Sequence, residues 1–425
     1  MLIFTCVDKG YPTGNNKSIY LRKQNMSQNE QLNFYGLGIA PAILSVIERL
    51  KFTVPTKIQF QAIPIGLQGQ DVMGIAQTGT GKTMAFGIPL VQRLAQIKGK
   101  ALIVVPTREL AIQVDESLRK IATALGFKTV VLIGGDSMGK QIQNLKASPR
   151  IIIGTPGRLI DHMQQKTLHF NDAHILVLDE ADRMLDMGFG PQIQQLLKQV
   201  PKDRQTMLFS ATMPESIMNI ARSYMKLPVR VEVAPAGTMA DKVTQELFIV
   251  KKELKNELLE SMLAKYKGSV LIFCRTKHSV ARLTKQLRTM RHNASETHSD
   301  RSLSQRKEAL EGFKRGKYRI LVATDIAARG IDVKGIELVI NYDLPDDPEN
   351  YVHRIGRTGR AELTGHAMSF ATPDQRLDVK NIERIINQTL PVADSHPTIP
   401  LEKFHHPKSP VMAFSTPRRM RMRRR

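Results

Sequence analysis

Two short segments combine the residue types that handle phosphate groups and a divalent cation. In the first, AQTGTGKT at 76–83, glycines precede Lys82 and Thr83, and an apolar, helix-compatible run follows. The backbone N–H groups of such a loop and the positive end of the next helix attract phosphate oxygens. The alternative is a glycine-rich turn that contains a lysine by chance, because Ala76 stands where the general pattern has Gly. The candidate nucleotide-binding residues here are Thr78, Gly79, Thr80, Gly81, Lys82 and Thr83.

The second segment, ILVLDEADRML at 175–185, runs from four apolar residues into Asp179, Glu180 and, after one alanine, Asp182. Mg²⁺ takes one or two carboxylates together with waters and phosphate oxygens. We expect Asp179 and the Thr83 hydroxyl to hold Mg²⁺, partly through water, and Glu180 to polarise an attacking water. A carboxylate at a strand end is usually plain surface. The glycine loop, expected at another strand end of the same sheet, gives these acids their significance.

The elements that must position these residues are short apolar runs separated by helical stretches. A first series reads ALIVVPT, TVVLIGG, RIIIGTP, ILVLDE and TMLFSAT, and a second reads SVLIFCRT, RILVATD, LVINYD and AMSFAT. Continuous apolar runs are typical of strands that are covered on both faces. The sequence therefore predicts an α/β protein with two doubly wound parallel sheets, whose carboxyl ends would carry the ligand sites.

Size and charge narrow the class of protein further. The chain has 425 residues, more than the roughly 250 to 300 that one core supports, so two domains are expected. The formal charge of +23 favours a polyanionic partner, with nucleic acid ahead of acidic lipid. The two cysteines are not at disulfide-framework or metal spacing, and no apolar run approaches a membrane span. We therefore expect a cytoplasmic protein with no membrane partner.

Composition also suggests where the domains end. The stretch VAPAGTMADKV at 233–243 is small, polar and without periodicity, which indicates a linker. From His405 the chain carries Lys408 and six arginines with no acid, which predicts a disordered tail that is compatible with non-specific RNA tethering. Met26 is an alternative start. We predict a disordered extension at 1–28, a first domain at 29–236, a linker at 237–243, a second domain at 244–395 and a basic disordered tail at 396–425.

Between about 34 and 375 the chain resembles the DEAD-box ATP-dependent RNA helicases of superfamily 2. The resemblance is carried by an ordered set of motifs: PTKIQ with an upstream Phe34, AQTGTGKT, PTREL, GG, TPGR, DEAD, SAT, LIFCRT, ATDIAARGID and HRIGRTGR. Each motif is weak alone, whereas the set in this order is highly specific. It implies two tandem RecA-like domains joined by a short linker, an ATPase that uses ATP and Mg²⁺, and RNA as the partner. The wording of RILVATDIAARGIDV suggests a bacterial, RhlE-like member.

The resemblance also implies roles for single residues at the nucleotide. Gln59 would hydrogen-bond the adenine edge, and Phe34, upstream of it at the family's spacing, would stack on the ring. In isolation, Gln59 would be taken for an ordinary surface glutamine. Arg357 and Arg360 would contact the phosphates and act with the catalytic residues, so that hydrolysis needs both domains closed on one ATP. Gly330 and Asp332 would lie near the phosphates and the ribose.

Two further groups follow from the family's motifs. Coupling between nucleotide state and RNA grip is implied for Asp182, Ser210, Thr212 and His353. For Arg354, a structural ion pair and a ligand contact are equally compatible with the sequence. RNA-backbone contacts are implied for residues that each follow an apolar run, without a base-reading array. These are Thr107, Arg108, Gly135, Thr155, Arg158, Arg275 and Thr324.

One segment departs from the family's pattern. In SLSQRKEALEGFKRG at 302–316, Leu303 stands upstream of Phe313 where many members have glutamine, and Gln305 lies nearby. Arg306 is where the family's arginine falls, and Gln305 is not assigned to the site. Met184 and Met187 are expected to be core residues.

The interpretation with the most support is an RNA-stimulated ATPase that locally unwinds short RNA duplexes or remodels RNA–protein complexes without strong sequence specificity, as a monomer. A DNA helicase of the same superfamily stays open, because phosphate contacts do not distinguish RNA from DNA. A long-lived RNA clamp that keeps the same motifs also stays open. A metabolic P-loop enzyme is disfavoured by the second sheet. The biological RNA is expected in ribosome assembly or RNA turnover.

Overall fold

The structure is a computed structural model that describes residues 33–77, 79–233, 243–328, 333, 335–359 and 364–404. The expected extension at 1–28, residues 237–242 of the expected linker and positions 405–425 of the expected tail lie outside the described residues.

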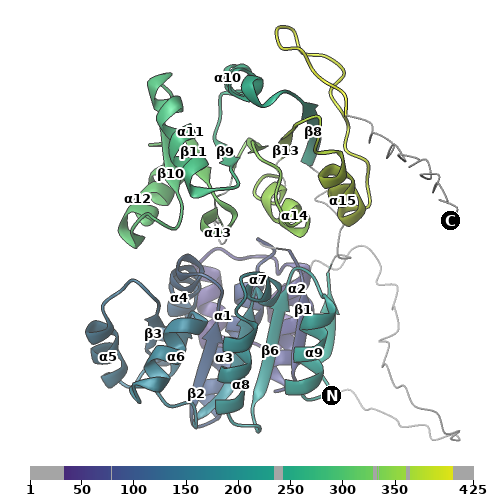
Figure 1. The fold of residues 1–425 in the computed structure, drawn as a ribbon. Helices are drawn as coiled ribbons and strands as arrows, with labels where there is room; N and C mark the ends of the chain where they lie inside the picture. Colours follow the sequence, from purple (N-terminus) through teal and green to yellow (C-terminus); the bar gives the residue numbers. More distant parts are fainter. Residues whose placement is uncertain are drawn as a thin grey trace, which may run out of the picture. The chain divides into compact units, whose positions relative to one another are not determined.

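Seven parallel strands form the first sheet, sheet A, in the order β3-β4-β2-β5-β6-β1-β7 (Figure 1). The strands are β1 (Val72–Ile75), β2 (Lys100–Val104), β3 (Thr129–Leu132), β4 (Ile151–Gly154), β5 (Ala173–Asp179), β6 (Gln205–Ser210) and β7 (Val229–Glu232). The glycine loop at 76–83, called the phosphate loop below after its expected role, follows β1, and Asp179 is the last residue of β5, with Glu180 and Asp182 directly after it. Because β1 and β5 both pair with β6, their carboxyl ends lie at one edge of the sheet.

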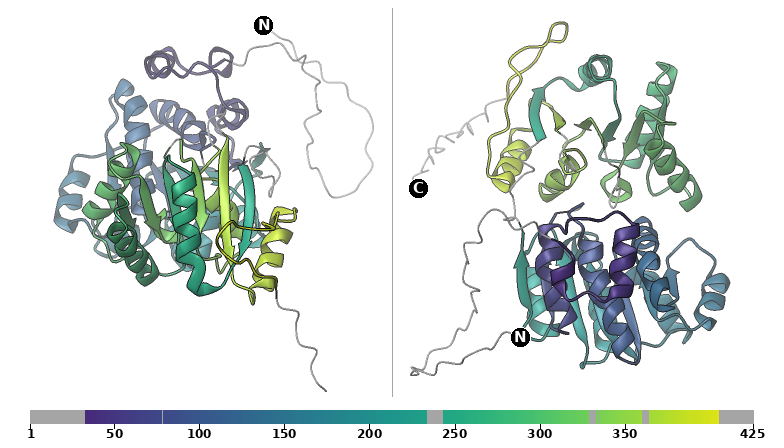
Figure 2. Two further views of the ribbon diagram at one scale, coloured as in Figure 1. Left: turned by 90° about the horizontal axis from the view of Figure 1, so that it is seen from above. Right: turned by 180° about the vertical axis from the view of Figure 1, so that it is seen from behind.

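Helices cover both faces of sheet A. The apolar side chains of α1 to α4 fill one face, and those of α5 to α9 fill the other (Figure 2, right, shows the purple and blue helices of the first group in front of the sheet). The helices are α1 (Pro41–Arg49), α2 (Lys57–Leu67), α3 (Lys82–Gln96), α4 (Arg108–Ala122), α5 (Met138–Lys146), α6 (Pro156–Gln164), α7 (Ala181–Asp186), α8 (Gly190–Gln199) and α9 (Glu215–Tyr224), with the 3-10 turns η1 (Tyr35–Leu37) and η2 (Thr123–Leu125).

The helix α4 shows how the sequence specifies these elements. Thr107 begins it as N-cap, where its hydroxyl accepts a hydrogen bond from Leu110 N at 3.2 Å. Val114, Leu118 and Ile121 then recur at helical spacing and are fully buried against sheet A. The cap fixes where α4 starts and the apolar stripe fixes which face packs.

Six parallel strands form the second sheet, sheet B, in the order β10-β11-β9-β12-β13-β8. The strands are β8 (Val243–Ile249), β9 (Val270–Phe273), β10 (Ala294–Thr297), β11 (Ile320–Ala323), β12 (Leu338–Asn341) and β13 (Gly365–Ala371). The helices are α10 (Lys255–Lys265), α11 (Lys277–Thr289), α12 (Leu303–Lys314), α13 (Asp325–Ala328), α14 (Glu349–Ile355) and α15 (Arg376–Ile386), with the turn η3 (Lys252–Leu254). The expectation of two doubly wound parallel sheets is confirmed.

Helices cover both faces of sheet B as well. One face packs against α10 and α11, and the other packs against α12 near β11 and against α14 and α15 near β13. Sheet B therefore buries its own core on each side, as expected for a domain with its own parallel sheet.

Two expected boundaries change. Val243, assigned to the linker, is the first residue of β8. Residues 396–404, assigned to the disordered tail, belong to a strap, defined here as residues 390–404, that packs on the second domain. Ile399 is buried against the core beneath α10, and Glu402 N donates to Ile249 O at 2.8 Å. The segment 396–404 contains three large apolar residues, Ile399, Leu401 and Phe404, and all three pack against the second domain.

Candidate nucleotide and RNA site

The phosphate loop joins β1 to α3 through two glycines with left-handed backbone. Gly79 has φ 84° and Gly81, the N-cap of α3, has φ 90°. A Cβ at Gly81 would collide with Gln59 Nε2, so only glycine fits there. Thr80 Oγ1 donates to Gln77 O at 2.7 Å and closes the turn. The loop therefore has the compact form that the glycine spacing predicts, while Thr78 lies outside the described residues.

Lys82 begins α3 and is buried, with 6% of its surface exposed. Its Nζ donates to Ala76 O at 2.9 Å, so the ammonium group lies across its own loop. Thr83 follows on the first turn of the same helix and is partly exposed. This hydrogen bond to Ala76 O uses an N–H of Lys82 Nζ that could otherwise be donated to a phosphate oxygen.

Asp179 ends β5 and is 3% exposed. Burial raises the pKa of its carboxyl to about 7, although the positive charge of Lys82 opposes the shift. Glu180 N donates to Asp179 Oδ1 at 2.9 Å. Burial disfavours the ionised form of Asp179, and a cation beside the carboxyl would stabilise that form. The position therefore suits a bound cation.

Glu180 is the N-cap of α7 and has φ 53° and ψ 51°. This left-handed conformation costs a non-glycine residue free energy. Its Oε2 lies 2.5 Å from Arg183 Nη1. Burial alone would raise the pKa of Glu180, but the positive charges of Arg183 and Lys82 outweigh it and hold that pKa below its usual value. Glu180 is therefore an oriented carboxylate at neutral pH.

Arg183 was missed by sequence reasoning. In the part of the chain that the structure describes, Arg183 is one of the largest side chains that are fully buried. The available signal was its spacing of three residues from Glu180 on a helix, which places the two side chains on one face.

The third acid, Asp182, bonds the segment after β6. Its Oδ2 accepts from Ala211 N at 2.9 Å, Thr212 N at 2.8 Å and Thr212 Oγ1 at 3.1 Å. Asp182 N donates to Ser210 Oγ at 3.1 Å. Asp182, Ser210 and Thr212 are therefore brought together. His353, on α14, is buried, and burial lowers its pKa to about 3, so its ring is neutral.

Gln59 bridges the start of α2 and the phosphate loop. Its Oε1 accepts from Thr56 N at 3.0 Å and its Nε2 donates to Gly81 O at 3.1 Å. A carboxamide has two donors and two acceptor lone pairs, so one of each is left over. Phe34 is packed in the core cluster of α1 and α2. Gln59 is thus a buried bridging residue, not the ordinary surface glutamine of the alternative interpretation.

Three of the residues expected to contact RNA lie together after β3 and at the start of α4 and α6. Arg108 faces Gly135, where a Cβ would collide with Arg108 Nη1 and where φ is 79°. Arg158 Nη1 donates to Asp136 O at 3.1 Å. Thr107 and Thr155 are the N-caps of α4 and α6. Glycine at 135 is therefore required by both its backbone angle and the guanidinium beside it.

In the second domain, Arg275 and Thr324 follow the adjacent strands β9 and β11. Arg275 Nε lies 3.1 Å from Asp346 Oδ1, and Arg275 N donates to Asp343 Oδ2 at 3.1 Å. Thr324 N donates to Thr297 O at 3.4 Å. Both residues therefore lie at the carboxyl edge of sheet B, where open α/β sheets bind ligands.

Of the two possibilities for Arg354, the structure shows an ion pair between the buried guanidinium and a partly exposed carboxylate. Its Nε and Nη2 donate to the two carboxylate oxygens of Asp325 at 2.6 and 2.7 Å, and its Nη1 donates to Asp343 O at 2.6 Å. Arg357, three residues later, is buried and its Nε donates to His353 O at 3.1 Å. Gly330, Asp332 and Arg360 lie outside the described residues.

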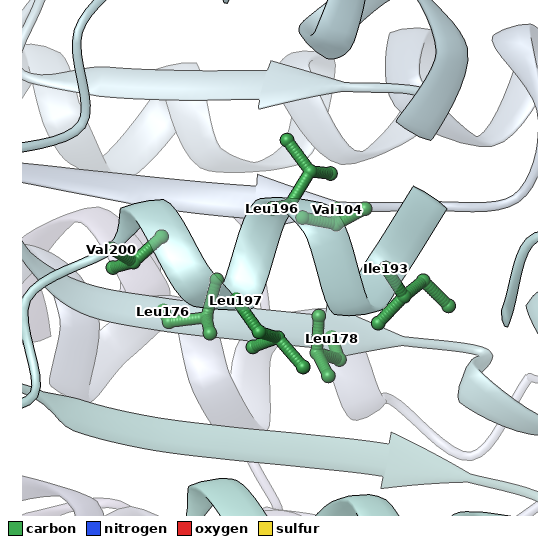
Figure 3. Close-up of a pocket in the computed structure, with 7 residues that line it drawn as sticks. All are labelled: Val104, Leu176, Leu178, Ile193, Leu196, Leu197 and Val200. Atoms are coloured by element: carbon green, nitrogen blue, oxygen red, sulfur yellow. The ribbon is translucent and has the colours of Figure 1, made fainter. Parts of the chain in front are cut away.

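Two features of the described residues bear on what else could bind. The gap between α8 and sheet A near Val104, Leu176 and Leu196 is apolar and leaves no room for a water molecule, so it is core packing (Figure 3). No cluster of three or more metal-ligating side chains occurs in the described ranges. Mg²⁺ needs no such cluster, because it retains waters and binds phosphate oxygens. Within the same ranges, no helix has the length and hydrophobicity to cross a membrane.

Similar proteins agree with this geometry. The family described as DEAD/DEAH box helicase matches residues 56–220, and the helicase conserved C-terminal domain matches 252–362. The DEAD-box ATP-dependent RNA helicase CshA of Geobacillus kaustophilus is 45% identical over 83% of this chain and 76% of its own length. CshA of Bacillus subtilis is 43% identical over 83% of this chain and 72% of its own length.

Solved structures give the same answer. S. cerevisiae Dbp5 bound to RNA and ADP BeF3 superimposes with a TM-score of 0.78 at 30% identity, covering 85% of this chain and 95% of Dbp5. Mss116p bound to ssRNA and AMP-PNP gives 0.77 at 28% identity, covering 88% and 78%. Both sheets are thus RecA-like domains. The expected RhlE-like subtype is not supported by the CshA relatives. The chain belongs to the DEAD-box ATP-dependent RNA helicases.

Proposed function

We propose that this helicase binds and hydrolyses ATP at the carboxyl ends of β1 and β5. Lys82 would hold the phosphates, Thr83 and Asp179 would hold Mg²⁺, and Glu180 would orient the attacking water. The observation that carries the proposal is electrostatic. Burial raises the pKa of Asp179 to about 7 against the opposing charge of Lys82, far away in sequence, whereas the charges of Arg183 and Lys82 outweigh burial at Glu180 and hold its pKa below the usual value. Three groups with complementary phosphate chemistry therefore share one site.

The residues of the chain divide the work of hydrolysis. A phosphate oxygen would replace Ala76 O as the acceptor for Lys82 Nζ, so nucleotide binding opens the loop's internal bond. Mg²⁺, when bound, would neutralise charge that develops on the phosphate oxygens. Glu180, kept anionic and oriented by Arg183, would accept a hydrogen bond from the water.

The second domain would complete this site with Arg357 and Arg360, and with Gly330 and Asp332 near the phosphates and ribose. The support is that the second domain has no glycine loop of its own after β8, so its arginines have no separate nucleotide to act on. Arginines at the transferring phosphate stabilise the charge that spreads over its oxygens.

RNA would be gripped along its backbone by two sets of residues. Arg108, Gly135 and Arg158, with the helix-capping Thr107 and Thr155, form the set in the first domain. Arg275 and Thr324 contribute from the second. Guanidinium, hydroxyl and glycine backbone groups suit phosphates and sugars and do not read bases, so binding would be sequence-independent.

Asp182 would transmit the nucleotide state to this grip. It bonds Ser210 and Thr212 through its carboxylate and its backbone N–H, and His353 is the neutral partner that we propose from the second domain. Selection of adenine would fall to Gln59, through its remaining donor and acceptor, with Phe34 beside the base. The mechanism would be local strand separation on closure, not long translocation.

The cellular role is proposed from chemistry alone. A monomer acting in the cytoplasm on RNA of ribosome assembly or turnover accords with the charge of +23 and the two cysteines. Crosslinking the protein to RNA in its own cells and sequencing the bound fragments tests this role. Recovery of fragments in proportion to RNA abundance would contradict a dedicated ribosomal or turnover target.

The assignment of the ATP site is tested with Glu180→Gln and Lys82→Ala. Glu180→Gln should abolish RNA-stimulated ATP turnover while ATP still binds, because only the orienting charge is lost. Lys82→Ala should also weaken ATP binding. Turnover that survives both substitutions in folded protein would refute the site.

A further inference from the structure

A buried polar chain lies beneath the glycine turn that follows β3. Gln141 on α5 and His162 on α6 are both fully buried, at 0% exposure. Gln141 Nε2 donates to Ile133 O at 2.8 Å, and Gln141 Oε1 lies 3.1 Å from His162 Nε2. At the other end, His162 Nδ1 lies 2.8 Å from Thr167 Oγ1. The turn at Gly134 and Gly135 begins directly after the bonded carbonyl.

The hydrogen-bond roles in this chain are determined. The Gln141 amide nitrogen faces a carbonyl, so its Oε1 must accept, and His162 Nε2 must therefore carry a proton. Burial, and secondarily the charge of Arg158, lowers the pKa of His162, so the ring is neutral and Nδ1 is an acceptor. The Thr167 hydroxyl has two acceptors within reach, His162 Nδ1 at 2.8 Å and His162 O at 3.0 Å, and its proton is shared between them. The side chains of Gln141 and His162 are therefore hydrogen-bonded at both ends.

The helix α6 holds the glycine turn from both sides. Before the turn, His162 acts through Gln141 on the carbonyl of Ile133. After the turn, Arg158 of the same helix donates to Asp136 O. The guanidinium of Arg108 lies against the glycines between these two points. The separation between Arg158 and the turn is therefore fixed by directional bonds and not by apolar contact alone.

A polar chain at this place has a cost that an apolar one would not. Burying an amide and an imidazole removes their water contacts, and hydrogen bonds inside the protein only roughly offset that loss. Apolar side chains of similar volume would fill the space without specifying orientation. What the polar chain adds is a fixed geometry for the turn.

We propose that Gln141 and His162 are positioning residues for RNA binding, which set the glycine turn and Arg158 in register for one stretch of phosphate backbone without touching RNA themselves. This inference rests on the proposed RNA role of Arg108, Gly135 and Arg158.

The experiment compares His162→Leu and Gln141→Leu, which break the chain, with His162→Gln, whose amide nitrogen can still donate to Gln141. RNA-stimulated ATP hydrolysis by the full chain is titrated with single-stranded RNA. The Leu variants should raise the KM for RNA about 5- to 30-fold, the equivalent of one or two lost hydrogen bonds, with kcat at saturating RNA within about two-fold. His162→Gln should recover most of the affinity.

Matched controls lie on the same two helices or directly after them. Gln143 on α5 and His169 after α6 are exposed, and Gln143→Leu and His169→Gln should leave the KM for RNA unchanged. Leu variants that are folded, by melting temperature, and that keep the wild-type KM would overturn the inference. If the Leu variants do not fold, Thr167→Val and His162→Gln decide: a KM raised about three-fold by the first and not by the second supports it, and equal KM values overturn it.

A further arm separates this inference from the function on which it rests. Arg158→Ala should raise the KM for RNA directly. If Arg158→Ala has no effect, the proposed RNA surface is wrong and the positioning role falls with it. If Arg158→Ala raises the KM and the Leu variants do not, only the positioning role is wrong.

Discussion

The two sheets have the same order for six strands, but they differ at one corner, defined here as the point where the first strand of each domain leads into its helix. Reading along each sheet, β3-β4-β2-β5-β6-β1 corresponds to β10-β11-β9-β12-β13-β8. Equivalent contacts follow: Arg150, before β4, donates to Leu94 O near the end of α3, and Arg319, before β11, donates to Tyr266 O at the end of α10, both at 2.9 Å. Each helix that follows β1 or β8 begins with a buried lysine, Lys82 or Lys255.

The difference lies in what the lysine meets. Lys82 follows a glycine loop, and its Nζ donates to Ala76 O of that loop. Lys255 follows η3, which has no glycine, and its Nζ donates to Tyr342 O at 2.8 Å and lies 3.6 Å from Asp343 Oδ1. In the second domain a carboxylate of the chain itself lies beside the lysine, where we propose that a phosphate binds in the first domain. The two folds are alike at this point, and the loops that precede the two helices differ.

The largest effect expected from this comparison is at the two lysines. Lys82→Ala should lower RNA-stimulated ATP turnover about 10³-fold or more, because the charge that meets the phosphates is lost. Lys255→Met should retain turnover, since no phosphate is expected there. Hydrolysis assays with melting curves for both proteins check this. Equal loss of turnover in folded protein would show that the two corners are not functionally distinct.

A smaller effect, on stability, is expected at Arg354 of the second domain, which forms an ion pair with Asp325. Arg354→Met should lower the free energy of unfolding of the second domain by about 3 kcal/mol, because Asp325 loses both bonds to the buried guanidinium. Urea titration measures the change. A change below about 1 kcal/mol would contradict a structural role and favour the ligand contact.

The next largest effect is expected at Asp182, which follows β5 and bonds the residues at the end of β6. Asp182→Asn should reduce duplex unwinding about 10- to 100-fold. Asp182 Oδ2 accepts three hydrogen bonds and Oδ1 accepts one from Arg183 N, and an amide, which has a single oxygen, cannot accept at both places. ATP turnover should fall less. Parallel assays of unwinding and hydrolysis on one RNA give the ratio, and a constant ratio would argue against coupling.

The smallest effect is the response to acid, which both domains should share. Burial lowers the pKa of His162 in the first domain and of His298 in the second. Their neutral forms are favoured in the folded state, so stability is fully present above the unfolded pKa near about 6.5 and is lost as the pH falls below it. From pH 7.5 to 5.5 the melting temperature should drop by about 2 to 5 °C, and His162→Gln should reduce that drop. A rise on acidification would reverse the assigned sign.

Much of the fold follows from local sequence, and the exceptions are informative. The continuous apolar runs of β2, β5, β9 and β11 identify buried parallel strands without other help. The strand β10, ASET, was missed, because Glu296 is buried there through an ion pair with Arg301 and not through hydrophobicity. The edge strand β7, VRVE, is short and half exposed, and gave no signal either.

The site shows the same division. The sequence predicted that Lys82 lies at the start of a helix and Asp179 at the end of a strand, and both placements are confirmed, since each motif is contiguous in sequence. Contacts between distant polar residues, such as Lys255 with Asp343 or Gln141 with His162, leave no periodic pattern and were not predicted. They become visible only when the sheet brings their elements together.

The strap at 390–404 covers the backbone edge of sheet B and so affects whether the protein can pair with other chains. The last strand of sheet B, β8, gives its outer backbone groups to the strap: Leu247 bonds Pro391 O and Ala393 N, and Ile249 O accepts from Glu402 N. An uncovered strand edge is a template for pairing with another chain. Residues after 390 therefore act as a guard against edge-to-edge self-association. A protein shortened before them would keep the residues proposed to bind and hydrolyse ATP and would expose an unpaired strand edge.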